Sequence, residues 1–381
     1  MIYTIPYIIL VCIMMCASFL HAKTDDETSK RNITIFVVAV FFIFMGFRGF
    51  ILSDWIVYYP YFYDCNLGYI TSFFQGDITC YEPGYTLLNI ICKFIFADYH
   101  FFVFVCSAIE TILLYKFFNE RVDNIPLAFT LFFVFDGLSI MANLMRNFIA
   151  ILIFLNALKY IEQRKPVKYF AACILALSFH TTSILYFPLY FFFHKSINKW
   201  VFIAIFAVCN IIYLGKISVF LTIASLFGLN SIFEDRIRVY TELYNASAGL
   251  SFGYLERLFT GLMIFLYYDR LKEIRPNNQV FINGLIFFFI MFFSFSEFQT
   301  LSRRFSYLFI YAYWIIWIDF IKCFSIENNK KLFISFIFVY CILRTGISTY
   351  LPDFDYENIL FGKTKSYQER LYLHNRTYDG P

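Results

Sequence analysis

Apolar segments close to the length of a membrane-spanning helix recur along the whole chain, separated by short polar turns. A helix needs about 20 apolar residues to cross the ~30 Å hydrocarbon core of a bilayer. The pattern therefore predicts an all-α, polytopic transmembrane helix bundle of about 10–12 spans, with re-entrant helices in addition. The segments expected to cross are 2–22, 33–52, 101–118, 126–142, 146–161, the span that starts at 200, 253–268, 280–297, 304–321 and 332–350.

Two other apolar stretches do not fit a simple crossing. Residues 84–97 would form a helix of only about 20 Å, so we interpret them as a re-entrant or interfacial helix. Residues 168–193 are interrupted by SFHTTS at 178–183. We interpret this stretch as a hairpin that enters from the inner face, with His180 near its tip.

The positions of Lys and Arg indicate how the chain is oriented in the membrane. Lys and Arg concentrate in the turns 23–31, 162–168 and 269–275, and cytoplasmic loops carry such an excess. We therefore expect these turns inside and the N-terminus outside, in a single integral membrane domain of residues 1–381. The expected outer segments are an acidic, aromatic loop at 53–83, an amphipathic stretch at 229–252 and the C-terminal tail 351–381.

The loop 53–83 carries carboxylates and aromatic rings but no Lys or Arg. Its acidic residues are Asp54, Asp64, Asp77 and Glu82. Acceptor groups beside flat rings suit sugar hydroxyls and sugar faces, so we expect Trp55, Tyr58 and the nearby Tyr85 to bind sugar. The alternative is an interfacial aromatic belt with solvated carboxylates.

Composition agrees with a membrane protein and excludes other classes. Of 381 residues, 60% are hydrophobic, 23% aromatic and only 15% charged, which is too apolar for a soluble domain. The net charge of +4 comes from clusters beside the apolar segments, so it does not indicate nucleic-acid binding. Metal-binding motifs are absent from the sequence, and we expect no metal and no cofactor. Cys65 and Cys80 share the outer loop, where a disulfide is one alternative.

Arginines stand at several helix ends that we expect to face outward, against the usual distribution of cations. Arg48, Arg146 with Asn147, and the pair Arg303 and Arg304 occupy such positions. A guanidinium at a helix N-terminus combines bidentate donors with the positive end of the helix dipole, which suits phosphate oxygens. The alternative for each is a cation that reaches the lipid headgroups.

His180 is an ionisable side chain at the break of an apolar segment. It is a candidate general base, or a hydrogen-bond donor to a phosphate oxygen. The alternative is a histidine bonded to a backbone carbonyl. We expect Thr181, Thr182 and Ser183 to cap the following helix.

In the order and spacing of these motifs the chain resembles the EpsG family of exopolysaccharide membrane proteins. The resemblance rests on RGF with SDWIVYYPYF after the second span, YEPGY at 81–85, LMRNFIAI at 144–151, SFHTTSILYFPLYF at 178–191, and SRRFSYLF at 302–309. It extends from about residue 33 to 320. The family commonly has Arg-Gln where this chain has Arg146-Asn147.

The resemblance implies a polymerase, related in role to Wzy-type enzymes, that makes exopolysaccharide, capsule or O-antigen. It would join oligosaccharide repeat units carried on undecaprenyl pyrophosphate, by glycosyl transfer at the outer face of the bacterial cytoplasmic membrane. His180, Glu82 or Asp54 would activate the acceptor hydroxyl, and Arg146, Arg303 and Arg304, with Arg48 secondary, would stabilise the leaving pyrophosphate. Chain-length regulators or export proteins are further conceivable partners.

Two other functions are compatible with the sequence. A transporter or flippase of the same lipid-linked sugars would show two similar halves and polar residues through the membrane depth. The charges here lie towards one side and no internal repeat is visible, which favours the enzyme. A membrane acyltransferase that decorates the polysaccharide is the other alternative.

Overall fold

The structure is a computed structural model that describes residues 2–219, 222, 226, 250–275, 277–362 and 364–378. Most of the expected amphipathic stretch at 229–252 therefore lies outside the described residues. The chain separates into two compact units. The first unit holds residues 1–190 and 331–381, the second holds residues 191–330, and each is described by itself.

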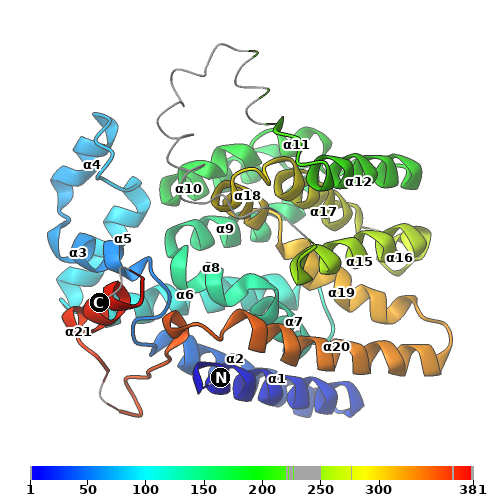
Figure 1. Ribbon diagram of the computed structural model, residues 1–381, viewed down its shortest axis with the longest axis horizontal. Helices are drawn as coiled ribbons and strands as arrows, with labels where there is room; N and C mark the ends of the chain where they lie inside the picture. Colours follow the sequence, from blue (N-terminus) through cyan, green and yellow to red (C-terminus); the bar gives the residue numbers. More distant parts are fainter. Residues whose placement is uncertain are drawn as a thin grey trace. The chain divides into compact units, whose positions relative to one another are not determined.

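Helices account for nearly all regular structure in the described ranges, which confirms the all-α class (Figure 1). The longer helices of the first unit are α1 (Ile5–Lys23), α2 (Glu27–Gly46), α3 (Trp55–Asp64), α4 (Leu67–Phe74), α5 (Pro83–Ile95), α6 (Tyr99–Asn119), α7 (Ile125–Phe132), α8 (Leu138–Asn143), α9 (Met145–Glu162), α10 (Pro166–Phe179), α20 (Glu327–Ser348, which starts in the second unit) and α21 (Tyr367–Tyr378). Shorter turns are η1 (Ile2–Thr4), η2 (Phe133–Gly137), η3 (Thr181–Tyr186) and η4 (Pro352–Phe354).

The second unit is also helical. Its elements are α12 (Lys199–Leu214), α15 (Phe252–Leu266), α16 (Tyr268–Ile274), α17 (Gln279–Ser294), α18 (Gln299–Tyr307) and α19 (Tyr311–Cys323), while α11 (Leu189–Phe192) joins the two units along the chain. A buried ion pair between Arg275 and Asp319, 2.9 Å apart, ties α19 to the segment that follows α16.

Five helices are long and apolar enough to cross a membrane, or six if the bent pair 301–307 and 311–323 is one span. The five are Ile2–Lys23, Glu27–Gly46, Tyr99–Asn119, Ile125–Asn143 and Glu327–Ser348. The other segments expected to cross also form helices. However, α12, α15 and α17 are shorter, and α9 includes Arg146, Lys159 and Glu162. The protein is therefore a multi-pass membrane protein.

One candidate span is broken in its middle. Between α7 and α8 the backbone kinks at Phe135 and Asp136, and Asp136 has a positive φ of 61°. Arg344 of α20 donates to the carbonyl of Val134 at 3.0 Å and to Asp136 Oδ2 at 3.1 Å. The arginine thus satisfies the backbone group and the carboxylate that the kink exposes, which is why a charge is tolerated in α20.

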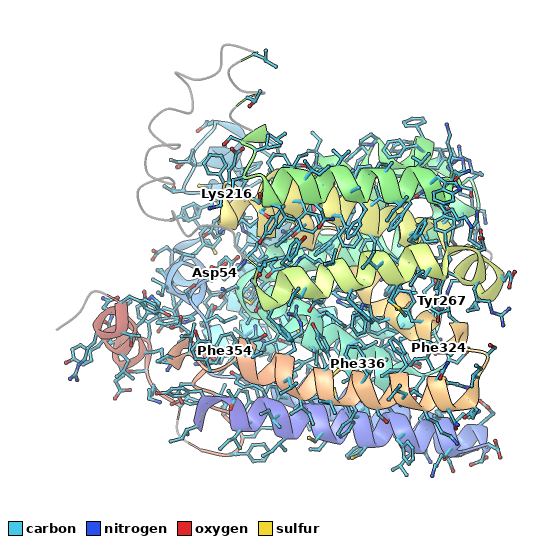
Figure 2. All side chains as sticks on the ribbon, turned by 45° about the vertical axis from the view of Figure 1, so that its right-hand side comes forward. Asp54, Lys216, Tyr267, Phe324, Phe336 and Phe354 are labelled. Atoms are coloured by element: carbon cyan, nitrogen blue, oxygen red, sulfur yellow. The ribbon has the colours of Figure 1, made fainter. Side chains whose placement is uncertain are left out.

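The acidic loop expected at 53–83 is folded into α3 and α4, and the C-terminal tail packs against its beginning. Backbone hydrogen bonds join Gly49 to Glu357, Leu52 to Asp353 and Ile359 to Phe47. Figure 2 labels Asp54 in the loop and Phe354 in the tail. Tyr367 of α21 stacks on Tyr59 of α3 with ring centroids 4.2 Å apart. The tail therefore holds the loop in place.

Replacing Tyr367 by alanine is expected to loosen this contact. The substitution removes the stacked ring and the hydrogen bond from Tyr367 Oη to the carbonyl of Ile56, about 1–3 kcal/mol together. Hydrogen exchange in residues 53–64 should rise. Tyr372→Ala on the exposed side of α21 is the matched control, and equal exchange in both variants would contradict the role of Tyr367.

Candidate functional site

An ion pair in the first unit joins two of the motifs singled out in the sequence. Glu82 Oε2 accepts a hydrogen bond from Arg146 Nη1 at 2.5 Å. The other carboxylate oxygen, Oε1, accepts from the backbone N–H of Thr181 at 2.9 Å. One carboxylate therefore ties the starts of α5 and α9 to the turn that follows α10.

The local sequence around Glu82 explains how the carboxylate reaches this position. Glu82 is the N-cap residue of α5, and Pro83 supplies the first helical residue, where a missing N–H costs nothing. The Glu82 side chain makes no hydrogen bond to its own helix. Its two oxygens point away from α5 and are available to α9 and to the turn at Thr181.

Gly84 allows α5 to approach α10 closely. A Cβ atom built on Gly84 would lie 2.5 Å from Ser178 Oγ and 2.8 Å from the Ser178 carbonyl oxygen. These distances are shorter than van der Waals contact, and the second atom belongs to the backbone and cannot rotate away. Only glycine therefore fits between α5 and the end of α10.

Gly84→Ala is accordingly expected to push α5 from α10 and to separate Glu82 from Thr181. Overpacking of this kind costs about 1–3 kcal/mol, so the thermal midpoint of the purified protein should fall. Gly346→Ala in α20 is a suitable control because a Cβ there meets nothing within 4 Å. An unchanged midpoint in Gly84→Ala would show that the two helices can separate at no cost.

Arg146 is held from two sides and still reaches the surface. Its guanidinium lies over the ring of Tyr81, with Cζ 4.1 Å from the ring centroid, and 22% of its side chain is exposed. Its Nε is buried and has no hydrogen-bond partner in the described part of the chain. The planar cation is thus fixed in orientation, and the exposed part of its side chain is the part that a ligand can reach.

The ring of His180 has a defined tautomer. His180 ends α10 in an extended conformation, and its Nδ1 accepts from the backbone N–H of Thr182 at 3.2 Å. A backbone N–H can only donate, so Nδ1 carries no proton and the neutral ring is protonated at Nε2. In the neutral ring Nε2 therefore acts as a hydrogen-bond donor.

Asn147 supports the same turn from α9. Thr182 Oγ1 lies 2.7 Å from His180 Nδ1 and 3.4 Å from Asn147 Oδ1, and because Nδ1 carries no proton, the one hydroxyl proton is shared between these two acceptors. The expectation that the threonines cap the next helix is wrong, because the His180 side chain is the cap of η3. Asn147 is buried and therefore holds the turn in position.

Glu82 stays ionised in this environment. Burial alone would raise the pKa of Glu82, but the Arg146 guanidinium, His180 and the Thr181 N–H outweigh it and hold the pKa below its ordinary value. A carboxylate with a lowered pKa is a weak proton acceptor. The geometry therefore suits Glu82 for orienting Arg146.

Asp54 lies on the other side of Tyr58. It is the first residue of the turn into α3, its carboxylate does not cap that helix, and its N–H donates to Asn143 Oδ1 at 3.1 Å. Burial raises the pKa of the Tyr58 hydroxyl, Asp54 adds to the rise, and Arg146 opposes it. Asp54 and Arg146 therefore both act electrostatically on Tyr58, and Asp54 is only half-buried.

Other residues expected to bind substrate are placed in the core. Trp55, Tyr58 and Tyr85 are buried in one aromatic cluster and do not offer an open ring face to a sugar. Arg48 is 3% exposed and donates to the carbonyls of Met45 and Met141 and to Ser107 Oγ. Burial of these groups reflects helix packing, and two of them, Tyr58 and Tyr85, reach the cluster around Glu82 through ring contacts with Tyr81.

The remaining expected residues lie elsewhere. Arg303 and Arg304 are on α18 in the second unit with exposed side chains, and their contact with phosphate stays a prediction. Cys65 and Cys80 are both buried and reduced. Groups of His, Cys, Asp and Glu able to hold a metal ion are not found in the described ranges.

Sequence reasoning missed three contributors to the cluster. Tyr81 stacks on Arg146, the Thr181 N–H binds Glu82, and Asn143 fixes the entry to α3. Tyr81 precedes Glu82 directly, which is a usable signal. Thr181 acts through its backbone N–H, and the Asn143 side chain accepts from two backbone N–H groups, so in each contact one partner leaves no trace in residue type.

A comparison with known protein families gives one match. Residues 31–359 match the EpsG family, over most of the chain. The searches of curated proteins and of solved structures gave no match.

Proposed function

The chain belongs to the EpsG family, which makes it a membrane protein of polysaccharide synthesis, and on that premise we propose that it is the polymerase of a surface polysaccharide. Its substrates would be oligosaccharide repeat units on undecaprenyl pyrophosphate, joined at the outer face of the bacterial cytoplasmic membrane. The observation that carries this proposal is the cluster of Glu82, Arg146 and the His180 turn. It gathers three motifs that are far apart in the chain.

The proposed reaction is a displacement at a sugar carbon. The oxygen of an acceptor hydroxyl bonds to the anomeric carbon of the donor unit, and the bond from that carbon to pyrophosphate breaks. The lipid pyrophosphate leaves with the bonding electrons, and the hydroxyl proton passes to a base. Negative charge therefore develops on the leaving group, and positive charge on the sugar ring.

Each group of the cluster has a role in this reaction. The Arg146 fork would bind the leaving phosphate, with Glu82 and Tyr81 fixing its orientation. His180 Nε2–H would donate a hydrogen bond to the same group, because Nδ1 is engaged by Thr182. Asp54 would take the hydroxyl proton, since it is a half-buried carboxylate close enough to Tyr58, beside Arg146, to raise the pKa of the Tyr58 hydroxyl.

Reconstitution provides a direct test. The purified protein is placed in liposomes that contain lipid-linked repeat units, and products are separated on a gel. We expect a ladder of polymers together with released undecaprenyl pyrophosphate, and no ladder with Arg146→Ala. Transfer of intact units between leaflets without a ladder would contradict the polymerase and would indicate a transporter.

A further inference from the structure

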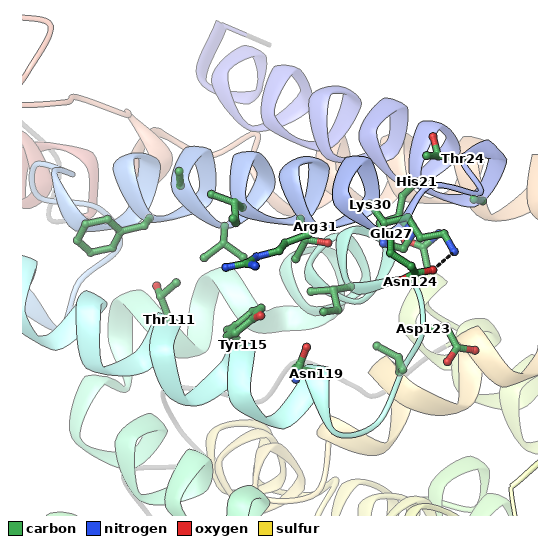
Figure 3. A pocket seen from close by; sticks show the side chains of 18 of the residues that line it. His21, Thr24, Glu27, Lys30, Arg31, Thr111, Tyr115, Asn119, Asp123 and Asn124 are labelled. Carbon is green, nitrogen blue, oxygen red and sulfur yellow. Dashed lines mark hydrogen bonds and ion pairs between the residues drawn. The ribbon is translucent and has the colours of Figure 1, made fainter.

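A cavity of about 1210 Å³ lies between α2 and α6 of the first unit (Figure 3). It reaches the turn that joins α1 to α2 and the turn after α6. Pockets for small molecules are usually about 300–1,000 Å³, so this cavity has room for a larger ligand. Both flanking helices are candidate spans, so the cavity lies where lipid is the surrounding solvent.

The lining of the cavity has two chemically different ends. The part of the cavity between the middles of α2 and α6 is mainly apolar. Its apolar lining residues are Ile35, Val38, Ala39, Phe42, Ala108 and Ile112. The end at the two turns is charged and is formed by Asp25, Glu27, Lys30, Arg31 and Asp123. A ligand that fills the cavity must therefore have a charged head and an apolar body.

The length of the lining matches a lipid tail. From Glu27 to Phe42 it follows roughly 22 Å of α2, whereas one leaflet contributes about 15 Å of hydrocarbon. The apolar residues on α2, from Ile35 to Phe42, account for roughly 10 Å of that length, so the apolar part lies within one leaflet and the charged mouth lies at the headgroup region. Ile35 and Ile112, 54% and 64% exposed, form facing walls.

The charged residues at the mouth of the cavity determine which kind of lipid headgroup can bind there. Lys30 is paired with Glu27 at 2.7 Å, but Arg31 has no hydrogen bond or ion pair with the rest of the described chain. Figure 3 shows Arg31 extending into the space between α2 and α6, near Thr111 and Tyr115. Around it the carboxylates of Asp25, Glu27 and Asp123 outnumber the two cations. A phosphate accompanied by an ammonium group complements this arrangement better than an anionic head does.

We propose that this cavity binds one zwitterionic aminophospholipid, such as phosphatidylethanolamine, from the leaflet beside the turn between α1 and α2. Its phosphate would contact Arg31, its ammonium group the carboxylates at the mouth, and its acyl chains the groove between α2 and α6. The mouth of the cavity lies at the start of α2, whereas Arg48 follows the end of α2. The Arg48 guanidinium donates to the carbonyl of Met141, which shortly precedes Arg146 in the sequence. The lipid is thus separate from the substrate proposed for the cluster.

Native mass spectrometry of the full chain tests this site. The protein is extracted from nanodiscs made of equal parts of phosphatidylethanolamine and phosphatidylglycerol, and the mass of any retained lipid is measured. We expect one phosphatidylethanolamine per chain. Arg31→Ala should reduce its retention about tenfold or more, and Ala39→Trp, which fills the apolar part, should abolish it.

Two controls match these variants. Lys168→Ala removes an exposed cation from the start of α10, and Ile43→Trp adds a ring on α2 outside the cavity, so both should retain the lipid. Retention of phosphatidylglycerol, of a polyprenyl phosphate or of no lipid by the wild type would overturn the proposal. Equal loss in the test and control variants would also overturn it. Polymer synthesis is a separate readout, so failure here leaves the proposed reaction untouched.

Discussion

Replacing Arg146 by lysine is expected to abolish most polymerisation, and Arg146→Ala should lower the rate by about 10²–10³-fold. The guanidinium meets Glu82 through Nη1 and lies flat on Tyr81, with Nε still unengaged. A lysine keeps the charge but has a single ammonium group, which cannot make the ion pair, the stacking contact and a phosphate contact together. Polymer formed per unit time in liposomes is the measurement.

A second arginine provides the control for charge and folding. Arg121 also pairs with a glutamate, Glu162, at 2.7 Å, and it lies outside the cluster around Glu82. Arg121→Lys should therefore cost stability of the same kind while polymerisation continues. If Arg146→Lys keeps full activity, or if Arg121→Lys loses as much, the arginine at 146 is a structural or headgroup-binding cation only.

The helical class and the positions of the crossing segments could be predicted because they depend on apolar length alone. The segments expected at 2–22, 101–118 and 126–142 correspond to helices long enough to span. The kink at Asp136 could not be predicted, since its partner Arg344 lies 208 residues away in the chain. The packing of the tail on residues 47–59 is equally nonlocal and rests largely on backbone hydrogen bonds.

The site could be predicted as a set of residues but not as an arrangement. Glu82, Arg146 and His180 stand out as polar groups among apolar ones, and the structure brings them together. Which of the four acidic residues in 53–83 pairs with Arg146 depends on the close approach at Gly84, a packing detail. Trp55 and Tyr85 were expected to bind sugar, but an aromatic residue has the same sequence signal when it packs in a core.

The second prediction separates the candidate bases, and Asp54 is expected to matter more for proton transfer than His180. Loss of a general base costs about 10²–10⁴-fold, so Asp54→Asn should nearly stop polymer growth while preserving the shape of the side chain. His180→Gln should retain activity to within about tenfold. A glutamine amide keeps a donor near the place of Nε2–H, and donation is the role that the Thr182 contact leaves to the neutral ring.

Cells provide the readout that also excludes a transport defect. With Asp54→Asn, single repeat units should reach the outer face and stay open to added glycosidase, whereas a transporter defect would leave them on the inner leaflet. Asp64→Asn is the matched control, because Asp64 is an exposed carboxylate at the far end of the same helix α3. Normal polymer length in Asp54→Asn would remove it as the base. If His180→Gln lowers the polymerisation rate as much as Asp54→Asn does, the histidine is the general base. Glutamine preserves the hydrogen-bond donor and removes only the basic nitrogen.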